Sequence, residues 1–139
     1  MLPDRDDPDS RPFWEGCERG ELLVQSCGVC GHLAQPPRPM CPQCRSLDRR
    51  WISTSGRGAI WSFIVPHPPL LAPYTDFAPY NVVIVALDEH PQIRFVGNVI
   101  EAEGAALNSV DPHSIGIGEP VRVVFNTIDD VTLPFWVRA

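Results

Sequence analysis

Two pairs of closely spaced cysteines constrain this chain more than any other feature. Cys27 and Cys30 form the first CxxC pair, Cys41 and Cys44 form the second, and residues 31–40 lie between them. The turn of each pair can present two thiolates to one ion, and two facing turns complete a tetrahedral four-cysteine site for Zn²⁺. We therefore predict a zinc ribbon over residues 27–44 with these four cysteines as the metal ligands.

The predicted metal site is closed, because protein thiolates fill all four positions and leave none for water or substrate. Closed four-cysteine sites are structural as a rule, so the zinc is expected to stabilise a segment that has little core of its own. Redox chemistry at a CxxC pair is the alternative, but it requires a βαβ setting that the sequence lacks. The fifth cysteine, Cys17, is interpreted as a small buried side chain rather than a nucleophile.

The chain after residue 55 is rich in short strand patterns. These patterns are RGAIWSFIV, NVVIVALDE, QIRFVGNVI, EPVRVVFNTI and VTLPFWVRA, and the last two form a hairpin around Asp129 and Asp130. Sixteen prolines and ten glycines among 139 residues favour short strands and turns over long helices. Five strands with a helical interruption after the third predict an OB-fold barrel. A five-stranded SH3-like barrel is the alternative.

The order of these patterns predicts a mainly β fold in three segments. Residues 1–11 carry four aspartates, two arginines and two prolines, a composition that predicts a disordered tail. Residues 12–50 are expected to hold a short helix over Pro12–Gly20 and then the four-cysteine zinc ribbon. Residues 51–139 are expected to form the five-stranded OB-fold barrel.

Charge and hydropathy narrow the classes of partner. The formal net charge is −6, and an acidic chain repels phosphate backbones, so nucleic acid is not expected as a partner. No apolar run reaches the roughly 18 residues that a membrane span requires. The first residues, MLPDRDDPDSRP, lack the apolar stretch of a secretory signal. We therefore expect a cytoplasmic protein without a membrane partner.

The sequence offers no self-sufficient active site, and no residue is assigned a catalytic role. None of the histidines lies in a recognisable nucleophile or metal pattern; they are His32, His67, His90 and His113. Asp88 and Glu89 are adjacent at the end of a strand, so their side chains point to opposite faces. A small acyl-CoA enzyme such as a thioesterase is a competing hypothesis, and it would depend on His67 with a partner from its loop.

The loop PHPPLLAPYTDFAPYN, residues 66–81, has an unusual composition. It holds five prolines, two leucines, two tyrosines and a phenylalanine. Stiff apolar loops lose little entropy on binding, and aromatic residues are enriched at protein interfaces. The alternative, given equal weight, is that the loop covers the open end of the barrel. The candidates for contact with a partner or a substrate channel are Phe13, Trp14, His67, Pro68, Leu70, Tyr74, Phe77 and Tyr80.

The order of features along the chain resembles one family. A helix that contains Phe13 and Trp14 comes first, followed by GELLVQSC, CGHLAQPPRPMCPQC, GRGAIWSFIVPH, PYNVVIVALDE and IGEPVRVVF. This order resembles the DUF35 family of acyl-CoA-associated proteins, which have an N-terminal rubredoxin-like zinc ribbon and a C-terminal OB-fold. The resemblance covers residues 12–139. One departure is His90-Pro91, where such proteins often carry a glycine, and it affects the shape of the hairpin turn.

The resemblance implies an accessory role beside a thiolase-superfamily enzyme. Such partners include lipid-transfer-protein-type thiolases that act as retro-aldolases on β-hydroxyacyl-CoA esters in steroid side-chain degradation. There the related domain is often fused to a MaoC-like hydratase. The resemblance therefore implies a non-catalytic subunit that stabilises a thiolase-like aldolase and helps to shape its CoA or acyl channel. The expected assembly is a hetero-oligomer with two copies of each subunit, and acyl-CoA is the expected shared ligand.

Arginines around the ribbon and its junction with the barrel are the candidates for binding the phosphates of CoA, because guanidinium groups suit phosphate recognition. These candidates are Arg38, Arg45, Arg49, Arg50 and Arg57. Ordinary solvated charge is an equally weighted interpretation. A zinc-ribbon and OB-fold module that binds single-stranded nucleic acid is the alternative function, since both folds are used for that purpose.

Overall fold

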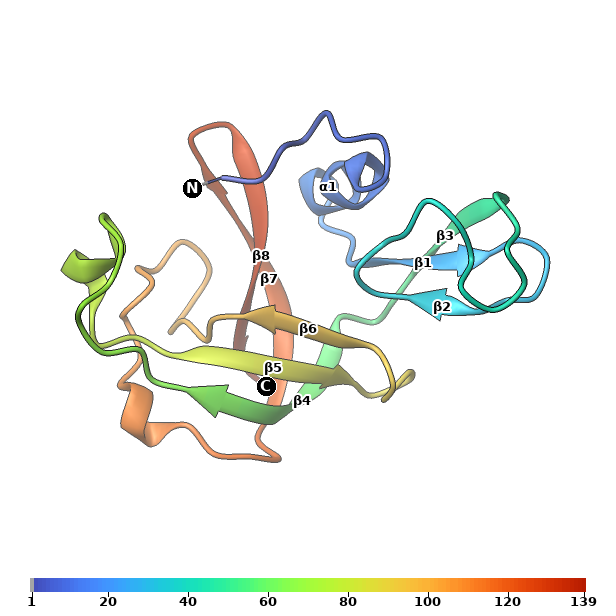
Figure 1. Ribbon diagram of the computed structural model, residues 1–139. Helices are drawn as coiled ribbons and strands as arrows, with labels where there is room; N and C mark the ends of the chain where they lie inside the picture. Colours follow the sequence, from blue (N-terminus) through green and yellow to red (C-terminus); the bar gives the residue numbers. More distant parts are fainter. Residues whose placement is uncertain (1) are drawn as a thin grey trace.

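The computed structural model describes residues 2–139, which form a short helix, a small three-stranded sheet and a larger five-stranded sheet. Along the chain the elements are α1 (Arg11–Glu18), β1 (Leu23–Cys27), β2 (Leu33–Ala34), β3 (Arg49–Ser53), β4 (Arg57–Ile64), η1 (Tyr74–Phe77), β5 (Val82–Leu87), β6 (Arg94–Gly97), η2 (Pro112–Ser114), β7 (Pro120–Ile128) and β8 (Val131–Arg138). Figure 1 shows the small sheet on one side of the large one, with α1 above their junction. The predicted mainly β fold is confirmed.

The predicted N-terminal helix is confirmed as α1. Pro12 lies in its first turn, where the missing N–H is not needed. Gly20 follows the helix with a φ of 76°, a left-handed conformation that a residue with a side chain rarely adopts. Phe13 and Cys17, four residues apart, share one face of the helix, and both are buried.

The ribbon sheet has the order β2-β1-β3, so β1 is its central strand. All five residues of β1 pair with β3, from Leu23 opposite Ser53 to Cys27 opposite Arg49. The residues that flank these two strands are also joined: the hydroxyl of Thr54, after β3, donates to the carbonyl of Leu22, before β1, at 2.8 Å. The ribbon sheet therefore extends across the domain boundary expected between residues 50 and 51.

The larger sheet has the order β6-β5-β4-β7-β8 and curls into a half-barrel. Its open side is partly closed where the backbone of Trp136 in β8 accepts from Ile100 and donates to Asn98, at 2.8 and 2.9 Å. Asp129 and Asp130 form the β7–β8 turn with φ values of 47° and 68°, which match the right-handed twist of a two-residue hairpin. The predicted turn is therefore confirmed. Within residues 2–139, no helix is long and apolar enough to cross a membrane.

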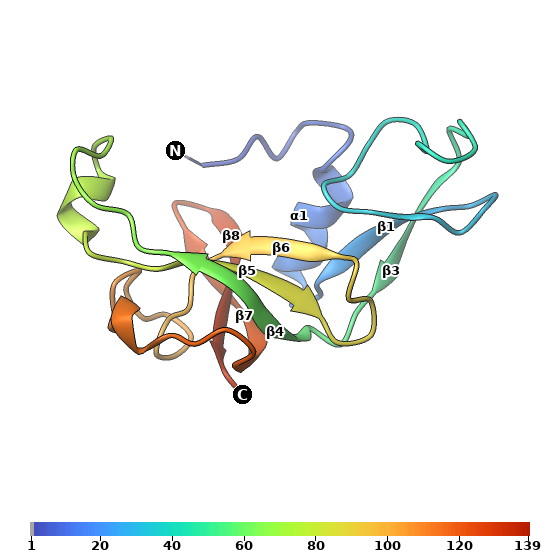
Figure 2. The same cartoon turned by 60° about the horizontal axis from the view of Figure 1, so that its bottom comes forward.

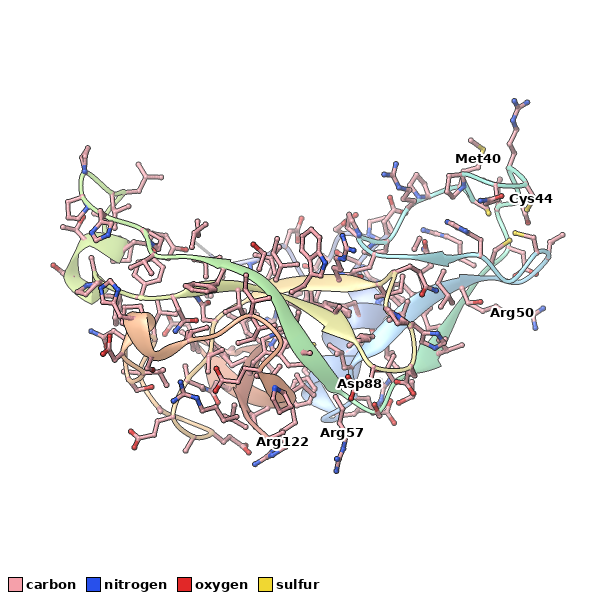
Figure 3. All side chains as sticks on the ribbon, turned by 90° about the horizontal axis from the view of Figure 1, so that it is seen from below. Met40, Cys44, Arg50, Arg57, Asp88 and Arg122 are labelled. Atoms are coloured by element: carbon pink, nitrogen blue, oxygen red, sulfur yellow. The ribbon has the colours of Figure 1, made fainter. Side chains whose placement is uncertain are left out.

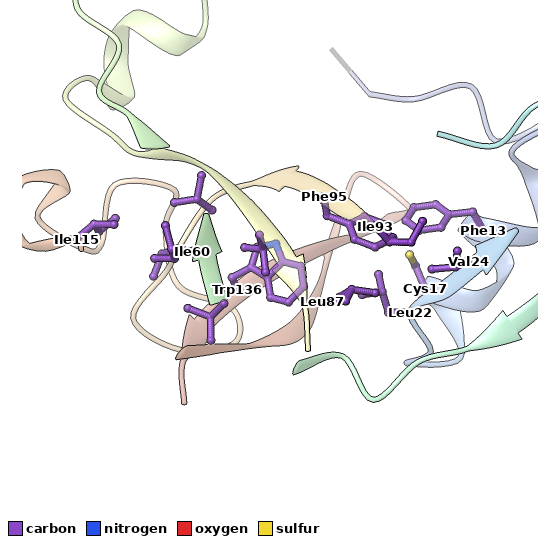
Figure 4. Close-up of a cluster of buried hydrophobic side chains, with 14 of the residues drawn as sticks. Phe13, Cys17, Leu22, Val24, Ile60, Leu87, Ile93, Phe95, Ile115 and Trp136 are labelled. Carbon is purple, nitrogen blue, oxygen red and sulfur yellow. The ribbon is translucent and has the colours of Figure 1, made fainter. Parts of the chain in front are cut away.

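One hydrophobic core joins the helix, the ribbon and the barrel. Phe13 of α1 stacks on Phe95 of β6 with ring centroids 6.1 Å apart. Figure 4 shows helix and ribbon side chains meeting barrel side chains in this cluster. Buried members of the cluster include Phe13, Cys17, Leu22, Val24, Leu87, Ile93, Phe95 and Trp136. The two sheets therefore share their buried apolar surface rather than having separate interiors.

Residues 2–10 return from α1 toward the tip of the β7–β8 hairpin (Figure 2). The guanidinium of Arg5 donates to the carbonyl of Asp130 at 2.7 Å, and Asp9 accepts from Arg49 of β3 at 2.6 Å. Met1 lies outside the described residues. Disorder of residues 1–11 in solution stays a prediction, and the contacts of Arg5 and Asp9 are the ones that it would break.

Candidate metal centre and apolar groove

The four predicted cysteine ligands converge at the tip of the ribbon. Their sulfur atoms all lie within 4.8 Å of one another, with 3.5 Å between Cys27 Sγ and Cys44 Sγ and 3.6 Å between Cys30 Sγ and Cys41 Sγ. A tetrahedral zinc ion with Zn–S bonds of about 2.3 Å separates its sulfurs by about 3.8 Å, whereas a disulfide requires about 2.05 Å. The cluster therefore fits a four-cysteine metal site and not a pair of disulfides.

The two cysteine pairs form turns with the same hydrogen-bond pattern. The N–H of the first cysteine in each pair donates to a carbonyl five residues on, that of His32 or Ser46, at 2.9 Å. Its carbonyl accepts at 3.0 Å from the N–H four residues on, that of Gly31 or Arg45. Gly31 and Arg45 both have a positive φ, of 73° and 64°. The second turn therefore forces a non-glycine residue into the left-handed region.

Backbone donors favour the thiolate form at two of the four cysteines, Cys27 and Cys41. At Cys30 and Cys44, the N–H groups of His32 and Ser46 also lower the pKa, but burial and the neighbouring sulfurs outweigh them and raise it. The N–H groups of Cys30 and Val29 lower the pKa of the Cys27 thiol to about 6, and the N–H of Val29 lies 3.4 Å from its sulfur. The N–H of Cys44 lowers the pKa of Cys41 in the same way. Burial instead raises the pKa of Cys17 in α1 to about 12, so that thiol stays protonated and unreactive.

A second candidate site is an apolar groove of about 1080 Å³ between the η1 loop and the β7–β8 hairpin. Its apolar lining comes from both of these elements and from the loop that follows β6. The apolar side chains include Tyr74, Phe77, Leu107, Phe125, Leu133 and Phe135, and polar groups are contributed by Asn98, Asn126 and Thr127 among others. A mainly apolar wall with a few polar groups is typical of sites for apolar small molecules.

A buried asparagine anchors the loop that forms one wall of the groove. Asn81 is fully buried at the end of the loop. Its amide donates to the carbonyl of Val99 at 2.8 Å and accepts from the N–H of Val99 at 2.7 Å. This reciprocal pair holds the loop against the segment that closes the barrel. Leu71 in the same loop is 79% exposed and no residue of η1 is buried, so the loop presents apolar side chains to solvent.

Comparison with known families identifies the family to which this architecture belongs. Residues 14–48 match the family model described as "ChsH2, rubredoxin-like zinc ribbon domain", and residues 51–126 match "ChsH2, C-terminal OB-fold domain". The chain belongs to the ChsH2 (DUF35) family. This membership confirms the predicted OB-fold over the SH3-like alternative and confirms the resemblance drawn from the sequence.

Curated relatives of this ChsH2-family chain carry two kinds of name. The "3-oxo-4,17-pregnadiene-20-carboxyl-CoA hydratase alpha subunit" of Mycobacterium tuberculosis is 32% identical over 97% of this chain. A "probable enoyl-CoA hydratase alpha subunit" of Thermomonospora curvata is 35% identical over 88% of it. The chain spans only 42% and 35% of these two relatives' lengths. A "DUF35 domain-containing scaffold protein" of Methanothermobacter thermautotrophicus is 33% identical, with 80% of this chain and 76% of the relative covered.

A solved structure covers nearly the whole fold of this ChsH2-family chain. It is named "Ltp2-ChsH2(DUF35) aldolase", and the matched chain is 29% identical with a TM-score of 0.76. The match covers 98% of each chain. The helix, ribbon and half-barrel described above are therefore arranged as in a chain from an aldolase complex.

The structure divides the loop residues predicted to contact a partner or substrate. Tyr74 and Phe77, both in η1, line the groove. His67 and Pro68 are exposed in the stretch of the loop before η1, and Leu70 is half-buried. The groove residues of β7 and β8 were not predicted from the sequence, because these strands are distant from the loop along the chain and lie beside it only in the folded protein.

The remaining predicted contact residues lie elsewhere. Phe13 is 6% exposed and Tyr80 is 8% exposed, so neither presents its ring on the surface. Phe13 belongs to the core because it stacks on Phe95. Trp14 is half-buried and donates from its indole N–H to the hydroxyl of Ser10 at 3.3 Å. Figure 1 places α1 and the η1 loop at opposite ends of the half-barrel, so Phe13 and Trp14 do not form one site with Tyr74. Tyr80 instead lies beside Tyr74, with ring centroids 6.3 Å apart.

The five predicted CoA-phosphate arginines are not gathered into one site. Arg49 is engaged by the Asp9 carboxylate at 2.6 Å, and Arg50 pairs with a neighbouring carboxylate at 3.4 Å. Arg38 and Arg45 are exposed on loops of the ribbon. Four of the candidates therefore lie on the ribbon, two of them already paired with acidic groups.

The fifth candidate, Arg57, lies on β4 directly opposite Arg122 of β7. Figure 3 shows both side chains projecting from the same region of the barrel, away from Cys44 at the ribbon tip. Like charges in opposite positions of paired strands destabilise the sheet unless something binds them. Arg122 could not be identified from the sequence, because its pairing with Arg57 depends on the register between two strands far apart in the chain.

Proposed function

We propose that this chain is a non-catalytic accessory subunit of an Ltp2-type, thiolase-like aldolase that acts on acyl-CoA esters in steroid side-chain degradation. The observation that carries the proposal is the likeness, over 98% of both chains, to the DUF35 chain of a structure named as an Ltp2-ChsH2 aldolase. A hydratase subunit is proposed as a further partner, because two relatives are named hydratase alpha subunits. A cytoplasmic location is part of the same proposal.

The arrangement of titratable groups supports placing catalysis on the partner. Within residues 2–139, no histidine side chain makes a hydrogen bond to a carboxylate or hydroxyl group that could form a catalytic pair. His67 is exposed on a loop, and His113 is exposed in η2. The four-cysteine cluster has all of its positions filled by thiolates, so a bound Zn²⁺ has no position for substrate. We therefore assign the metal a structural role: it fixes the two CxxC turns against each other.

The groove supports a role in shaping the acyl channel of the partner. Its volume of about 1080 Å³ and its aromatic walls suit the apolar body of a large acyl group rather than a short chain. Tyr74 and Phe77 are proposed to contact that group, with Asn126 near the polar rim. Contact with the CoA phosphates is proposed for the exposed Arg38, Arg45 and Arg57.

Co-expression with an Ltp2-type subunit from the same organism tests the proposal. Size-exclusion chromatography should show one complex, and the complex should cleave a steroid β-hydroxyacyl-CoA ester that this chain alone leaves intact. Replacing Phe77 with Ala should raise KM for the steroid ester more than for a short acyl-CoA ester. Leu71→Ala, an exposed change in the same loop, is the matched control. Turnover by the isolated chain, or an aldolase subunit that is equally stable and active without it, would contradict the accessory role.

A further inference from the structure

The outer face of strands β4, β5 and β6 is apolar and exposed. Val96 is 72% exposed, Ile64 is 62% exposed and Trp61 is 49% exposed. Strand pairing places Ile64 opposite Val82, and it places Ile84 between Ser62 and Val96. Directly opposite side chains in a sheet lie about 5 Å apart, so these residues form one continuous patch rather than scattered apolar positions.

The alternation of β5 creates this patch. Its inward side chains, Val83, Val85 and Leu87, belong to the core. The outward positions should then be polar if that face met only water, yet they are filled by Val82, Ile84 and Ala86, which are half-buried. The continuous apolar run that predicted a buried strand therefore has a core on one face and an open apolar surface on the other.

A stacked pair of side chains marks the patch. The strand register is irregular between Ile60 and Ser62, at the position of Trp61. The guanidinium carbon of Arg94 lies 3.7 Å from the centroid of the Trp61 ring. Tryptophan and arginine are the residue types most enriched among the side chains that dominate binding energy at interfaces.

We propose that this face docks the aldolase subunit, through an apolar surface of that subunit that carries a carboxylate for Arg94. The identity of the partner rests on the proposed function; the location of the contact does not. We call this surface the β4–β6 outer face, and its residues are Trp61, Ile64, Val82, Ile84, Arg94 and Val96.

Charge complementarity decides the kind of occupant. Arg94 forms no ion pair within the described residues, and the β4–β6 outer face contains no carboxylate. A second copy of this chain would bring another Arg94 and no acidic group, leaving two desolvated cations without partners. A different protein with an acidic residue at the matching position satisfies both the apolar patch and the cation.

The position of the face agrees with the role of the groove. Ile64 ends β4, and the chain then enters the loop that contains Tyr74 and Phe77 of the groove wall. Figure 2 shows this loop extending from the ends of β4 and β5. A subunit seated on the β4–β6 outer face therefore lies beside the loop that forms one wall of the groove.

Aspartate substitutions on this face test the docking site. Val96→Asp and Ile64→Asp replace exposed side chains, so the fold should tolerate them, and they should weaken binding of the Ltp2-type subunit about 30-fold or more. Arg94→Glu should also weaken binding, and the loss should persist at high salt because the charge is reversed within the contact. Leu47→Asp, at a position 73% exposed on the ribbon and outside both CxxC turns, is the control and should bind like the wild type. Circular dichroism and zinc content should be unchanged in all four variants.

The outcomes separate this inference from the proposed function. If Val96→Asp and Ile64→Asp bind the Ltp2-type subunit as tightly as the wild type does, the docking site is wrong and the accessory role remains intact. Absence of wild-type binding to the Ltp2-type subunit would overturn both. A wild-type homodimer that Val96→Asp converts to a monomer, with unchanged affinity for the aldolase subunit, would show that a second copy occupies the face and would also overturn the inference.

Discussion

Replacing Asn81 with leucine should destabilise the barrel severely, although the two side chains have the same number and branching of heavy atoms. The Asn81 side chain is fully buried and makes two hydrogen bonds to the backbone of Val99, at 2.7 and 2.8 Å. Val99 is 1% exposed, so water cannot replace the lost partner. The substitution leaves one buried N–H and one buried carbonyl unpaired.

The magnitude follows from these two groups. Each buried unpaired backbone group costs about 1–3 kcal/mol, so Asn81→Leu should cost about 4 kcal/mol in total. That is a large fraction of the roughly 5–15 kcal/mol by which a domain of this kind is stable. With a urea m-value of about 2 kcal/mol per molar, the unfolding midpoint should fall by about 2 M.

Urea unfolding followed by tryptophan fluorescence provides the measurement, because Trp136 is buried in the same core. Asn98→Leu is the matched control: the Asn98 amide donates to the backbone carbonyl of Asn81 from a half-buried position, so its loss should cost about 1 kcal/mol. Hydrogen exchange should also show early opening of the loop before β5 in Asn81→Leu. A loss below 1 kcal/mol in that variant, or an equal loss in the control, would refute the reasoning.

Three further predictions concern the metal, a buried thiol and a close backbone contact. Cys41→Ser should reduce bound zinc, measured by elemental analysis, from one equivalent to nearly none, and unchanged zinc content would contradict the ligand assignment. Burial raises the pKa of Cys17 from 9.0 to about 12, so between pH 9 and pH 12 the unfolded chain binds fewer protons than the folded chain. The free energy of unfolding should therefore fall as the pH rises through that range. Cys17→Ala should reduce this fall, measured by denaturation at a series of pH values. Gly58→Ala should cost about 1–3 kcal/mol in thermal unfolding, because its new methyl group would overlap the carbonyl oxygen of Ala86, whereas Gly116→Ala enters open space and should be nearly neutral.

The parts of the fold that were predictable are those with local signals. The CxxC spacing identifies the metal site because each turn is built from consecutive residues, and the structure reproduces the same hydrogen bonds in both turns. The strand patterns after residue 55 and the turn at Asp129 and Asp130 are likewise local, since φ at the turn depends on those two residues. Five of the predicted strands appear as β4 to β8 for this reason.

The parts that were not predictable depend on contacts between distant segments. The position of Phe13 in the core requires α1 to pack on β8 and β1 so that the ring reaches Phe95 of β6, and nothing local distinguishes this ring from an exposed anchor. The pairing of Arg57 with Arg122 depends on the register of β4 and β7. The β4–β6 outer face was hidden for a related reason: an apolar run predicts burial, but it does not specify whether one or both faces of the strand are covered.

The shared core connects the metal site physically to the groove and to the β4–β6 outer face. Leu22 and Val24, at and before the central ribbon strand, pack in the same cluster as Phe95 and Trp136 of the barrel. Loss of the metal should therefore loosen barrel packing as well as the ribbon. A rigid body also loses less entropy on association than one with independently moving parts. The zinc is consequently expected to strengthen binding of the aldolase subunit without touching it, by holding the ribbon side of the common core in place while β4, β5 and β6 present their outer face.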